Sequence, residues 1–346
     1  MQVKNYVIGI TIFLVCFRLA GAFGADDARS VYNEAVKLHR AGKAKEAIAA
    51  YDRAIKINPR LPEAYVGRGA AYAKLGQRER AIKDQDEAIR LNPKLADAYY
   101  NRANAYDELK KHERAVQDYD QALSLNPKLT EAYNNRGFAY YKLGRYEQAI
   151  RDFDEAVRLD AKLTDAYFNR GNAHSIVKQY DRALQDYDQV IRLEPKNAAA
   201  YKQRAHVYSA LGKFDNAIQD FTEAIRLNSK DAEAYYSRGL AERRLDRHER
   251  AVQDYTMALR LNPKHAEAYN NRANAYSLLG QYDRAIQDYD AALKIEPRNA
   301  LIYANRGLVK LKQGKPAEAE KDFNKCIEID PSLKKKLEPL IEAGKS

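Results

Sequence analysis

Side-chain amides recur at one position of this chain, 34 residues or a multiple of 34 apart. An amide donates through its nitrogen and accepts through its oxygen, so it can bond to the main chain of a bound polypeptide whatever that polypeptide's sequence. The same amides can instead bond to neighbouring elements of this chain and hold them in place. Both interpretations stay open from the sequence. The residues concerned, which we call the asparagine ladder, are Asn33, Asn101, Asn135, Asn169, Asn271 and Asn305.

Aromatic and amide side chains also occupy the positions one before and three after the ladder, where charges such as Lys202 are few. Residues three and four apart share one face of a helix, so these side chains should flank the ladder. Such a surface favours an extended, largely uncharged segment. The flanking residues are Tyr100, Asn104, Asn134, Phe138, Phe168, Asn172, Tyr236, Asn270 and Asn274.

Residue patterns for catalysis or for metal and cofactor binding are missing from the sequence. The six histidines are scattered, and no His-x-x-x-His occurs. The glycines form no phosphate-binding loop, and there is no Gly-x-Ser-x-Gly. We therefore expect no catalytic residue, no metal site and no cofactor.

The ladder belongs to a unit that is repeated nine times. Prolines mark its period at Pro59, Pro93, Pro127, Pro195, Pro263, Pro297 and Pro331, and no insertion or deletion interrupts it. A fixed period of this length indicates one supersecondary unit copied in tandem. The units span residues 28–61, 62–95, 96–129, 130–163, 164–197, 198–231, 232–265, 266–299 and 300–333.

Each unit carries the pattern of two helices joined by a short turn. The first helix has Tyr at its fourth residue in eight units, a small residue at its eighth and usually Tyr at its eleventh. A glycine centres the turn in six units, and the second helix has Ala followed four residues later by an aromatic, as in Ala115 and Tyr119. Small residues let the two helices approach closely, and the aromatics fill the remaining space. One hairpin cannot bury its apolar face alone, so the units must stack.

This pattern resembles the tetratricopeptide repeat over residues 28–333. The resemblance implies an all-α fold, a right-handed superhelical solenoid of antiparallel helix pairs whose first helices line a concave groove. A similar asparagine ladder lines the superhelix of the O-GlcNAc transferase family, where it grips extended polypeptide. The glycosyltransferase domain of that family is absent here, so only its binding mode is implied.

Two further rows of charged residues run through units two to nine. An Arg follows the ladder position, from Arg68 to Arg306, and an Asp precedes the second-helix aromatic, from Asp84 to Asp322. We interpret them as ion pairs between neighbouring helices, each adding about 0.2–1 kcal/mol where exposed. The alternative is a basic strip for phosphate-bearing ligands.

Four residues depart from the aromatic pattern: Gln85, His174, Glu242 and Lys310. The charged ones should be tolerated because long side chains can extend their charge to water.

The two ends of the chain differ from the repeats. Residues 1–22 have a lysine, a short apolar stretch and small residues, the pattern of a cleaved signal peptide, with a membrane anchor as the alternative. Export to the periplasm or outside the cell follows from the first interpretation, with residues 23–27 as a linker. Residues 334–346 should form a helix that caps the last unit. Loss of Cys16 with the signal peptide would leave Cys326, expected in the core, as the only cysteine.

Taken together, the residues predict a non-enzymatic scaffold that binds an extended peptide or a partner protein in the concave groove. The alternative is an anionic polymer, a polysaccharide or nucleic acid, because the net charge is +11. The matched acidic row makes nucleic acid the less favoured partner. Membrane contact is expected only if residues 1–22 are retained, and the sequence assigns no oligomeric state.

Overall fold

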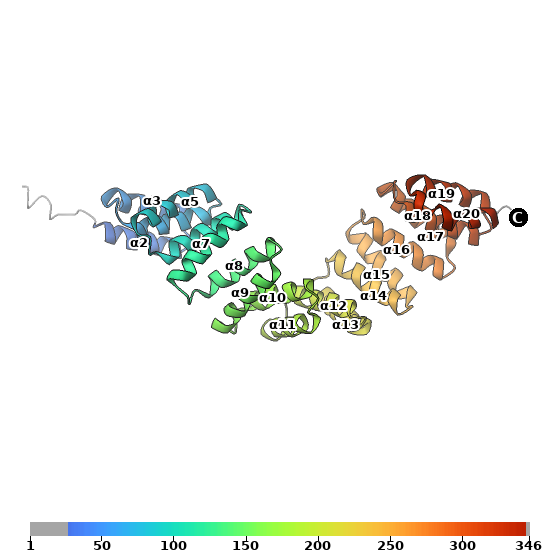
Figure 1. Cartoon of the computed structure of the whole chain (residues 1–346), viewed down its shortest axis with the longest axis horizontal. Helices are drawn as coiled ribbons and strands as arrows, with labels where there is room; N and C mark the ends of the chain where they lie inside the picture. Colours follow the sequence, from blue (N-terminus) through green and yellow to red (C-terminus); the bar gives the residue numbers. More distant parts are fainter. Residues whose placement is uncertain (1–26, 344–346) are drawn as a thin grey trace, which may run out of the picture. The chain divides into compact units, whose positions relative to one another are not determined.

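The computed structural model describes residues 27–343, which form nineteen α-helices, a 3₁₀ helix and no strand (Figure 1). The predicted all-α repeat solenoid is confirmed; the handedness of its superhelix stays a prediction. The signal peptide and residues 23–26 of the linker lie outside the described residues. Within residues 27–343, no helix has the length and apolar character needed to cross a membrane.

The helices alternate between a first and a second helix of each pair. The first helices are α2 (Ala28–Arg40), α4 (Pro62–Lys74), α6 (Ala96–Glu108), α8 (Thr130–Lys142), α10 (Thr164–Ile176), α12 (Ala198–Ala210), α14 (Ala232–Arg244), α16 (Ala266–Leu278) and α18 (Ala300–Lys312). The second helices are α3 (Ala44–Ile57), α5 (Arg78–Leu91), α7 (His112–Leu125), α9 (Tyr146–Leu159), α11 (Tyr180–Leu193), α13 (Phe214–Leu227), α15 (His248–Leu261), α17 (Tyr282–Ile295) and α19 (Pro316–Ile329). A short 3₁₀ helix, η1 (Pro331–Leu333), and α20 (Lys334–Ala343) follow.

The helix pairs form two compact units, which divide after Ala166 near the start of α10. The N-terminal unit holds α2 to α9, and the C-terminal unit holds α11 to α20. Within each of these two compact units, every first helix packs on its own second helix, and each second helix packs on the first helix of the next pair.

The turn between the two helices of a pair needs a left-handed residue. Gly144 has φ +72° at the centre of one such turn. Where the sequence lacks glycine, Lys110, Lys178 and Asp246 adopt φ of 59°, 59° and 56° instead. A non-glycine residue is strained in this region, so packing of the flanking helices must hold these three turns closed.

Small residues and aromatics build the core. In unit 96–129, Ala103, Ala115 and Tyr119 pack together, and each is at most 1% exposed. Close approach explains the small eighth residue: a Cβ added to Gly137 would lie 2.8 Å from the Phe153 ring. The repeat pattern therefore records the contact between the two helices of a pair.

Helix α20 covers the last pair. Leu337 is 6% exposed and packs in one cluster with Phe323 and Cys326 of α19, joined by Leu340 and Ile341. Cys326 is buried with a free thiol, and burial raises the pKa of that thiol. It therefore acts as a small apolar core residue.

Candidate functional site

Ion pairs between arginine and aspartate connect successive helix pairs within each of the two compact units. We call them the ion-pair ladder. The Nε and Nη2 atoms of Arg102 donate to both carboxylate oxygens of Asp118, each at 2.7 Å, and Nη1 donates to Asp86 of the preceding pair at 2.6 Å. The guanidinium also lies 5.6 Å from the ring of Tyr99, the fourth residue of the same helix. Seven further arginines bond in the same way to the aspartate of their own pair: Arg68, Arg136, Arg170, Arg204, Arg238, Arg272 and Arg306.

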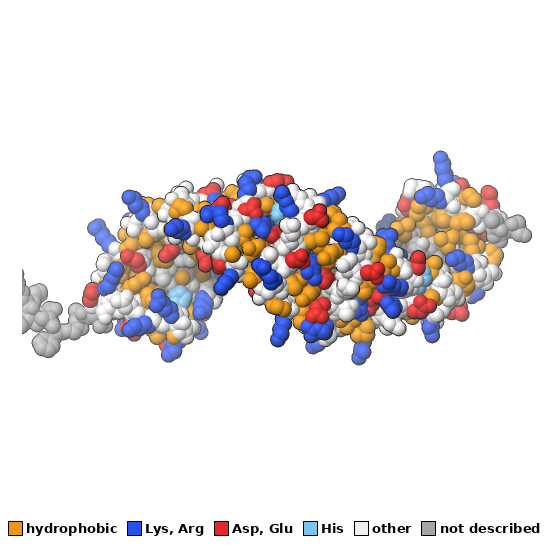
Figure 2. Space-filling view, turned by 90° about the horizontal axis from the view of Figure 1, so that it is seen from below, with side chains coloured by type: hydrophobic (Ala, Val, Ile, Leu, Met, Phe, Trp, Pro, Cys, Tyr) orange, Lys and Arg blue, Asp and Glu red, His pale blue; other side chains and the backbone are white. Residues whose placement is uncertain are grey.

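The ion pairs predicted from the two rows are present, and because their aspartates are buried, the 0.2–1 kcal/mol of an exposed pair does not apply to them. Asp84 and Asp152 are each 6% exposed, and burial raises the pKa of both carboxyl groups against the opposing effect of their arginines. Hydrogen bonding to Asp84 in turn raises the pKa of Arg68. The eight guanidiniums are thus paired and form no free basic strip. On the face in Figure 2, basic and acidic side chains are interspersed.

The ion-pair ladder is weaker on both sides of repeat unit 232–265, where it joins the preceding and the following repeat. Arg238 and Arg272 each direct Nη1 to a threonine hydroxyl, Thr222 at 3.0 Å and Thr256 at 2.9 Å, where other arginines reach a second aspartate. This second acidic row was not predicted, although its members lie 34 residues or a multiple of 34 apart in the sequence: Asp52, Asp86, Asp120, Asp188 and Asp290.

Three asparagines of the ladder bond to the preceding first helix. Asn135 Nδ2 lies 3.0 Å from Asn104 Oδ1 and 3.3 Å from the Tyr100 hydroxyl. Two more follow this rule in the C-terminal unit, where Asn271 donates to the Tyr236 hydroxyl at 2.9 Å and Asn305 to Asn270 Oδ1 at 3.3 Å.

These bonds use only the nitrogen of each ladder amide. Among the described residues, no donor bonds to the Oδ1 atoms of Asn271 and Asn305, and the amides of Asn33 and Asn101 have no partner at all. Asn135 Oδ1 accepts a bond from Asn134 at 3.2 Å. The structural interpretation of the ladder thus accounts for its donors but leaves acceptors available.

The asparagines three residues after the ladder have a structural partner. A buried tyrosine hydroxyl of the second helix donates to Oδ1 of each, in the pairs Tyr119–Asn104 at 2.5 Å, Tyr187–Asn172 at 2.8 Å and Tyr289–Asn274 at 2.6 Å. Unit 232–265 breaks the rule because Leu240 stands at this position. The hydroxyl of Tyr255, which is fully buried, consequently has no partner among the described residues.

The aromatic members of the predicted site pack against their own helix pairs. Phe168 meets Tyr187 edge-on at 6.0 Å, and Phe138 stacks on Tyr141 at 6.4 Å. Tyr236 is 8% exposed between Tyr255 and His265, and burial raises its pKa to about 12.

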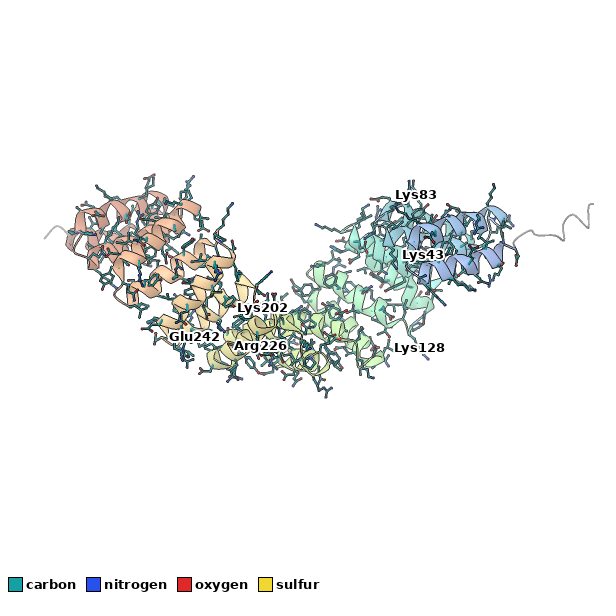
Figure 3. All side chains as sticks on the ribbon, turned by 180° about the vertical axis from the view of Figure 1, so that it is seen from behind. Lys43, Lys83, Lys128, Lys202, Arg226 and Glu242 are labelled. Atoms are coloured by element: carbon teal, nitrogen blue, oxygen red, sulfur yellow. The ribbon has the colours of Figure 1, made fainter. Side chains whose placement is uncertain are left out.

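Three of the four departures from the repeat, Gln85, His174 and Glu242, are buried, whereas Lys310 is half-buried. Glu242, labelled in Figure 3, is 5% exposed, so its carboxylate does not extend into water; its Oε2 lies 3.6 Å from Nη1 of the more exposed Arg247. Lys310 pairs with Asp322 at 2.9 Å. His174 is 4% exposed, and burial lowers its pKa.

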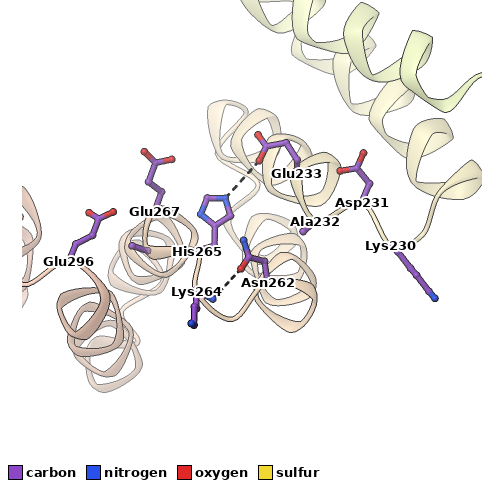
Figure 4. A pocket seen from close by; sticks show the side chains of 10 residues that line it. Lys230, Asp231, Ala232, Glu233, Asn262, Lys264, His265, Glu267 and Glu296 are labelled. Atoms are coloured by element: carbon purple, nitrogen blue, oxygen red, sulfur yellow. Dashed lines mark hydrogen bonds and ion pairs between the residues drawn. The ribbon is translucent and has the colours of Figure 1, made fainter. Parts of the chain in front are cut away.

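Two pockets open in the C-terminal unit, one on each side of α14. The first, of about 310 Å³, lies between α12 and α14 and has Phe214, Phe221 and Leu240 in its walls, with His206 and Arg244 beside them. We call it the apolar pocket. The second, of about 550 Å³, lies between the starts of α14 and α16 and includes Asp231, Glu233, Glu267, Glu296 and His265 (Figure 4). We call it the acidic pocket. The described residues hold no group of three or more potential metal ligands.

Family models match most of these repeats. The model described as "Tetratricopeptide repeat" matches residues 96–129, 130–163, 164–197, 266–299 and 300–333, and a second model of that description matches 202–266. A "TPR repeat" model matches 37–76 and 71–110.

The chain belongs to the tetratricopeptide repeat family.

Several solved structures share the fold, tetratricopeptide repeat proteins among them. The C-terminal part of a TPR repeat-containing protein from Cytophaga hutchinsonii is 18% identical, with a TM-score of 0.58 over 69% of this chain and 98% of that one. The pilF protein of Pseudomonas aeruginosa is 20% identical, with a TM-score of 0.54 over 62% and 97%. A protein from Parabacteroides merdae is 23% identical, with a TM-score of 0.51 over 72% and 98%. No curated protein matches the sequence significantly.

As a tetratricopeptide array, the chain is suited to be a protein-interaction scaffold. Hydrogen bonds between consecutive first helices join part of the predicted site: Asn135 with Tyr100 and Asn104, Asn271 with Tyr236, and Asn305 with Asn270. Asn33 and Asn101 are separated by α4, which carries Gly67 at the ladder position. Sequence reasoning missed the two pockets. The signals available for them were Ser237 at a ladder position and His206 and Leu240 at the positions that carry asparagine elsewhere.

Proposed function

We propose that this protein is a non-enzymatic scaffold that binds an extended polypeptide along the faces of its first helices. The observation that supports this most is the half-satisfied amide ladder. Each of Asn271 and Asn305 is held through Nδ2 by the preceding helix, and its Oδ1 is left to accept a bond. A peptide N–H can supply that bond, and such a contact does not depend on the side chains of the peptide.

The test is binding to an array of unstructured, uncharged peptides by full-length parent and by a variant with Asn135, Asn271 and Asn305 replaced by alanine. We expect the parent to bind many sequences and the variant to lose most of this binding at unchanged helix content. The matched control replaces three asparagines that accept backbone N–H bonds in the turns between pairs: Asn58, Asn92 and Asn126. Equal binding by parent and ladder variant would refute the proposal.

Salt separates peptide binding from the anionic-polymer alternative. Amide contacts are uncharged, so affinity should change little between 50 and 200 mM salt, whereas neutralising about six phosphates would weaken binding by about 10³-fold. A steep loss with salt would therefore support an anionic ligand instead.

We also propose export, with residues 1–22 as the cleaved signal. The support is the order of charged, apolar and small residues in that segment. N-terminal sequencing of the protein from cell fractions tests it: a start near residue 23 in the envelope or medium is expected, and an intact Met1 would indicate a retained anchor.

A further inference from the structure

Irregularities of the array gather in unit 232–265. Its ladder position holds Ser237, its arginine pairs are weakened at Thr222 and Thr256, and Glu242 is a buried acid. The unpartnered hydroxyl of Tyr255 lies in the same unit. Single departures occur in other units, but several coincide here, and such a concentration marks a candidate functional region.

The apolar pocket adjoins this region. In units 96–129, 164–197 and 266–299 the buried tyrosine hydroxyl points at the residue three after the ladder. Leu240 stands at the equivalent position of unit 232–265, packs in the cluster that holds Tyr255, and lines the pocket. The ring nitrogens of His206, in another wall, have no partner among the described residues, and the ring meets Phe221 edge-on at 5.1 Å. A volume of about 310 Å³ admits one large side chain.

The acidic pocket has the opposite chemistry. Asp231 is paired with Lys202 at 2.7 Å, whereas Glu233, Glu267 and Glu296 have no Lys or Arg partner among the described residues. Each of these three has another neighbour: His265 Nε2 lies 3.9 Å from Glu233 Oε2, the Tyr236 hydroxyl donates to Glu267 at 3.3 Å, and Asn299 Nδ2 donates to Glu296 at 2.8 Å. Figure 4 shows their carboxylates on one side of the pocket, while the amines of Lys230 and Lys264 extend away from them. A cationic group complements this charge.

The two pockets adjoin through α14. The Ser237 hydroxyl, in the apolar pocket, lies 3.4 Å from Glu233 Oε1 in the acidic pocket. From Glu233 to Leu240 is about two helical turns, or roughly 11 Å. Because the pockets flank α14, a sideways offset of about 9 Å adds to this distance. The combined separation of roughly 14 Å corresponds to about four residues of extended chain.

We propose that the C-terminal unit selects an extended peptide segment with a bulky apolar side chain and, about four residues away, a Lys or Arg. The apolar side chain enters the apolar pocket beside Leu240, and the basic side chain meets Glu233 and Glu267. This inference rests on the proposed function, to which it adds the class of ligand. In an extended chain, residues an even number apart project to the same side, so both side chains reach α14 together.

The test measures the affinity of the full-length protein for fluorescently labelled peptides by anisotropy. Each peptide has eleven residues, and all but the two tested positions are Ser, Asn or Thr. The probe carries Phe and Lys four residues apart, in either order. Three control peptides have Glu for Lys, Ala for Phe, or Phe and Lys adjacent. We expect the probe to bind at least ten-fold tighter than each control.

Protein variants assign each side chain to its pocket. Replacing Glu233 and Glu267 by lysine should reverse the preference, so that the Phe/Glu peptide binds tighter than the Phe/Lys probe. L240N should weaken the probe by about ten-fold and raise thermal stability, because an asparagine there can accept the bond from Tyr255. The matched control is L308N, the same change at the equivalent position of unit 300–333, where the facing aromatic is Phe323 and has no hydroxyl.

The outcomes separate this inference from the proposed function. Equal binding of the Phe/Lys and Phe/Glu peptides, with both lost when Asn271 and Asn305 are replaced, would overturn the inference and leave peptide binding in place. Binding of no peptide at all would overturn both. An unchanged preference in the double-lysine variant would remove the acidic pocket from the proposal.

Discussion

The two carboxylates that share Arg102 differ in burial, and this predicts unequal effects of the same substitution. The Asp118 side chain is 9% exposed and accepts two bonds, whereas Asp86 is 50% exposed and accepts one. Removing one partner of a buried ion pair costs about 3–5 kcal/mol. Because Arg102 keeps Asp86 and is 19% exposed, we expect the low end, about 3 kcal/mol, for Asp118→Ala. Asp86→Ala should cost about 0.5 kcal/mol, as for an exposed pair.

Amide hydrogen exchange of α6 and α7 is the suitable assay, because a repeat array need not unfold in one two-state step. A loss of about 3 kcal/mol accelerates exchange roughly 100-fold, and 0.5 kcal/mol about two-fold. Both changes place alanine inside a helix, so the gain in helix propensity is common to both. Adding Arg102→Leu to Asp118→Ala should recover part of the loss, since it removes a guanidinium whose Nε and Nη2 donors have lost their acceptor. Equal effects of the two alanines would refute the assignment of the cost to burial.

Three further changes test other parts of the array. Gly67→Ala would place a Cβ in steric overlap with the Tyr51 ring, so urea unfolding should show a loss of about 1–3 kcal/mol; no loss would mean that the ring moves freely. Thr222→Asp should give Arg238 a second carboxylate and raise stability by about 0.2–1 kcal/mol at low salt, with a smaller gain at high salt; a loss would contradict the ladder geometry. Burial lowers the pKa of His206 from 6.5, so the unfolded state binds more protons and stability should fall as the pH drops below about 6.5; His206→Gln should flatten this fall in the urea midpoint, and an unchanged slope would contradict it.

The parts of the fold that repeat could be predicted, because the same residue types reappear wherever the same contact is made. Small residues such as Gly137 lie against aromatics such as Phe153, and the arginine row meets the aspartate row. The burial of those aspartates could not be predicted, since it depends on how closely successive pairs stack. The pairing of Asn104 with Tyr119 was open to prediction, because asparagine and tyrosine occur together at these positions in three units.

The pockets could not be predicted, because they arise from side chains that fail to fill space between neighbouring units. The apolar pocket needs His206 and Leu240 on adjacent first helices together with the ring of Phe221. Taken singly, neither His206 nor Leu240 indicates a cavity in the sequence. Only their positions across α12 and α14 turn them into a cavity.

Unit 232–265 also links stability to binding in a way that a structural defect would not. If Leu240 were merely a poor choice of residue, L240N would satisfy Tyr255 and stabilise the array with no effect on ligands. If Leu240 is kept for the pocket, the same change must stabilise the fold and weaken the Phe-containing peptide together. The two measurements on one variant therefore decide between a defect and a binding site. Stabilisation without loss of affinity would assign the unpartnered hydroxyl to imperfect packing alone.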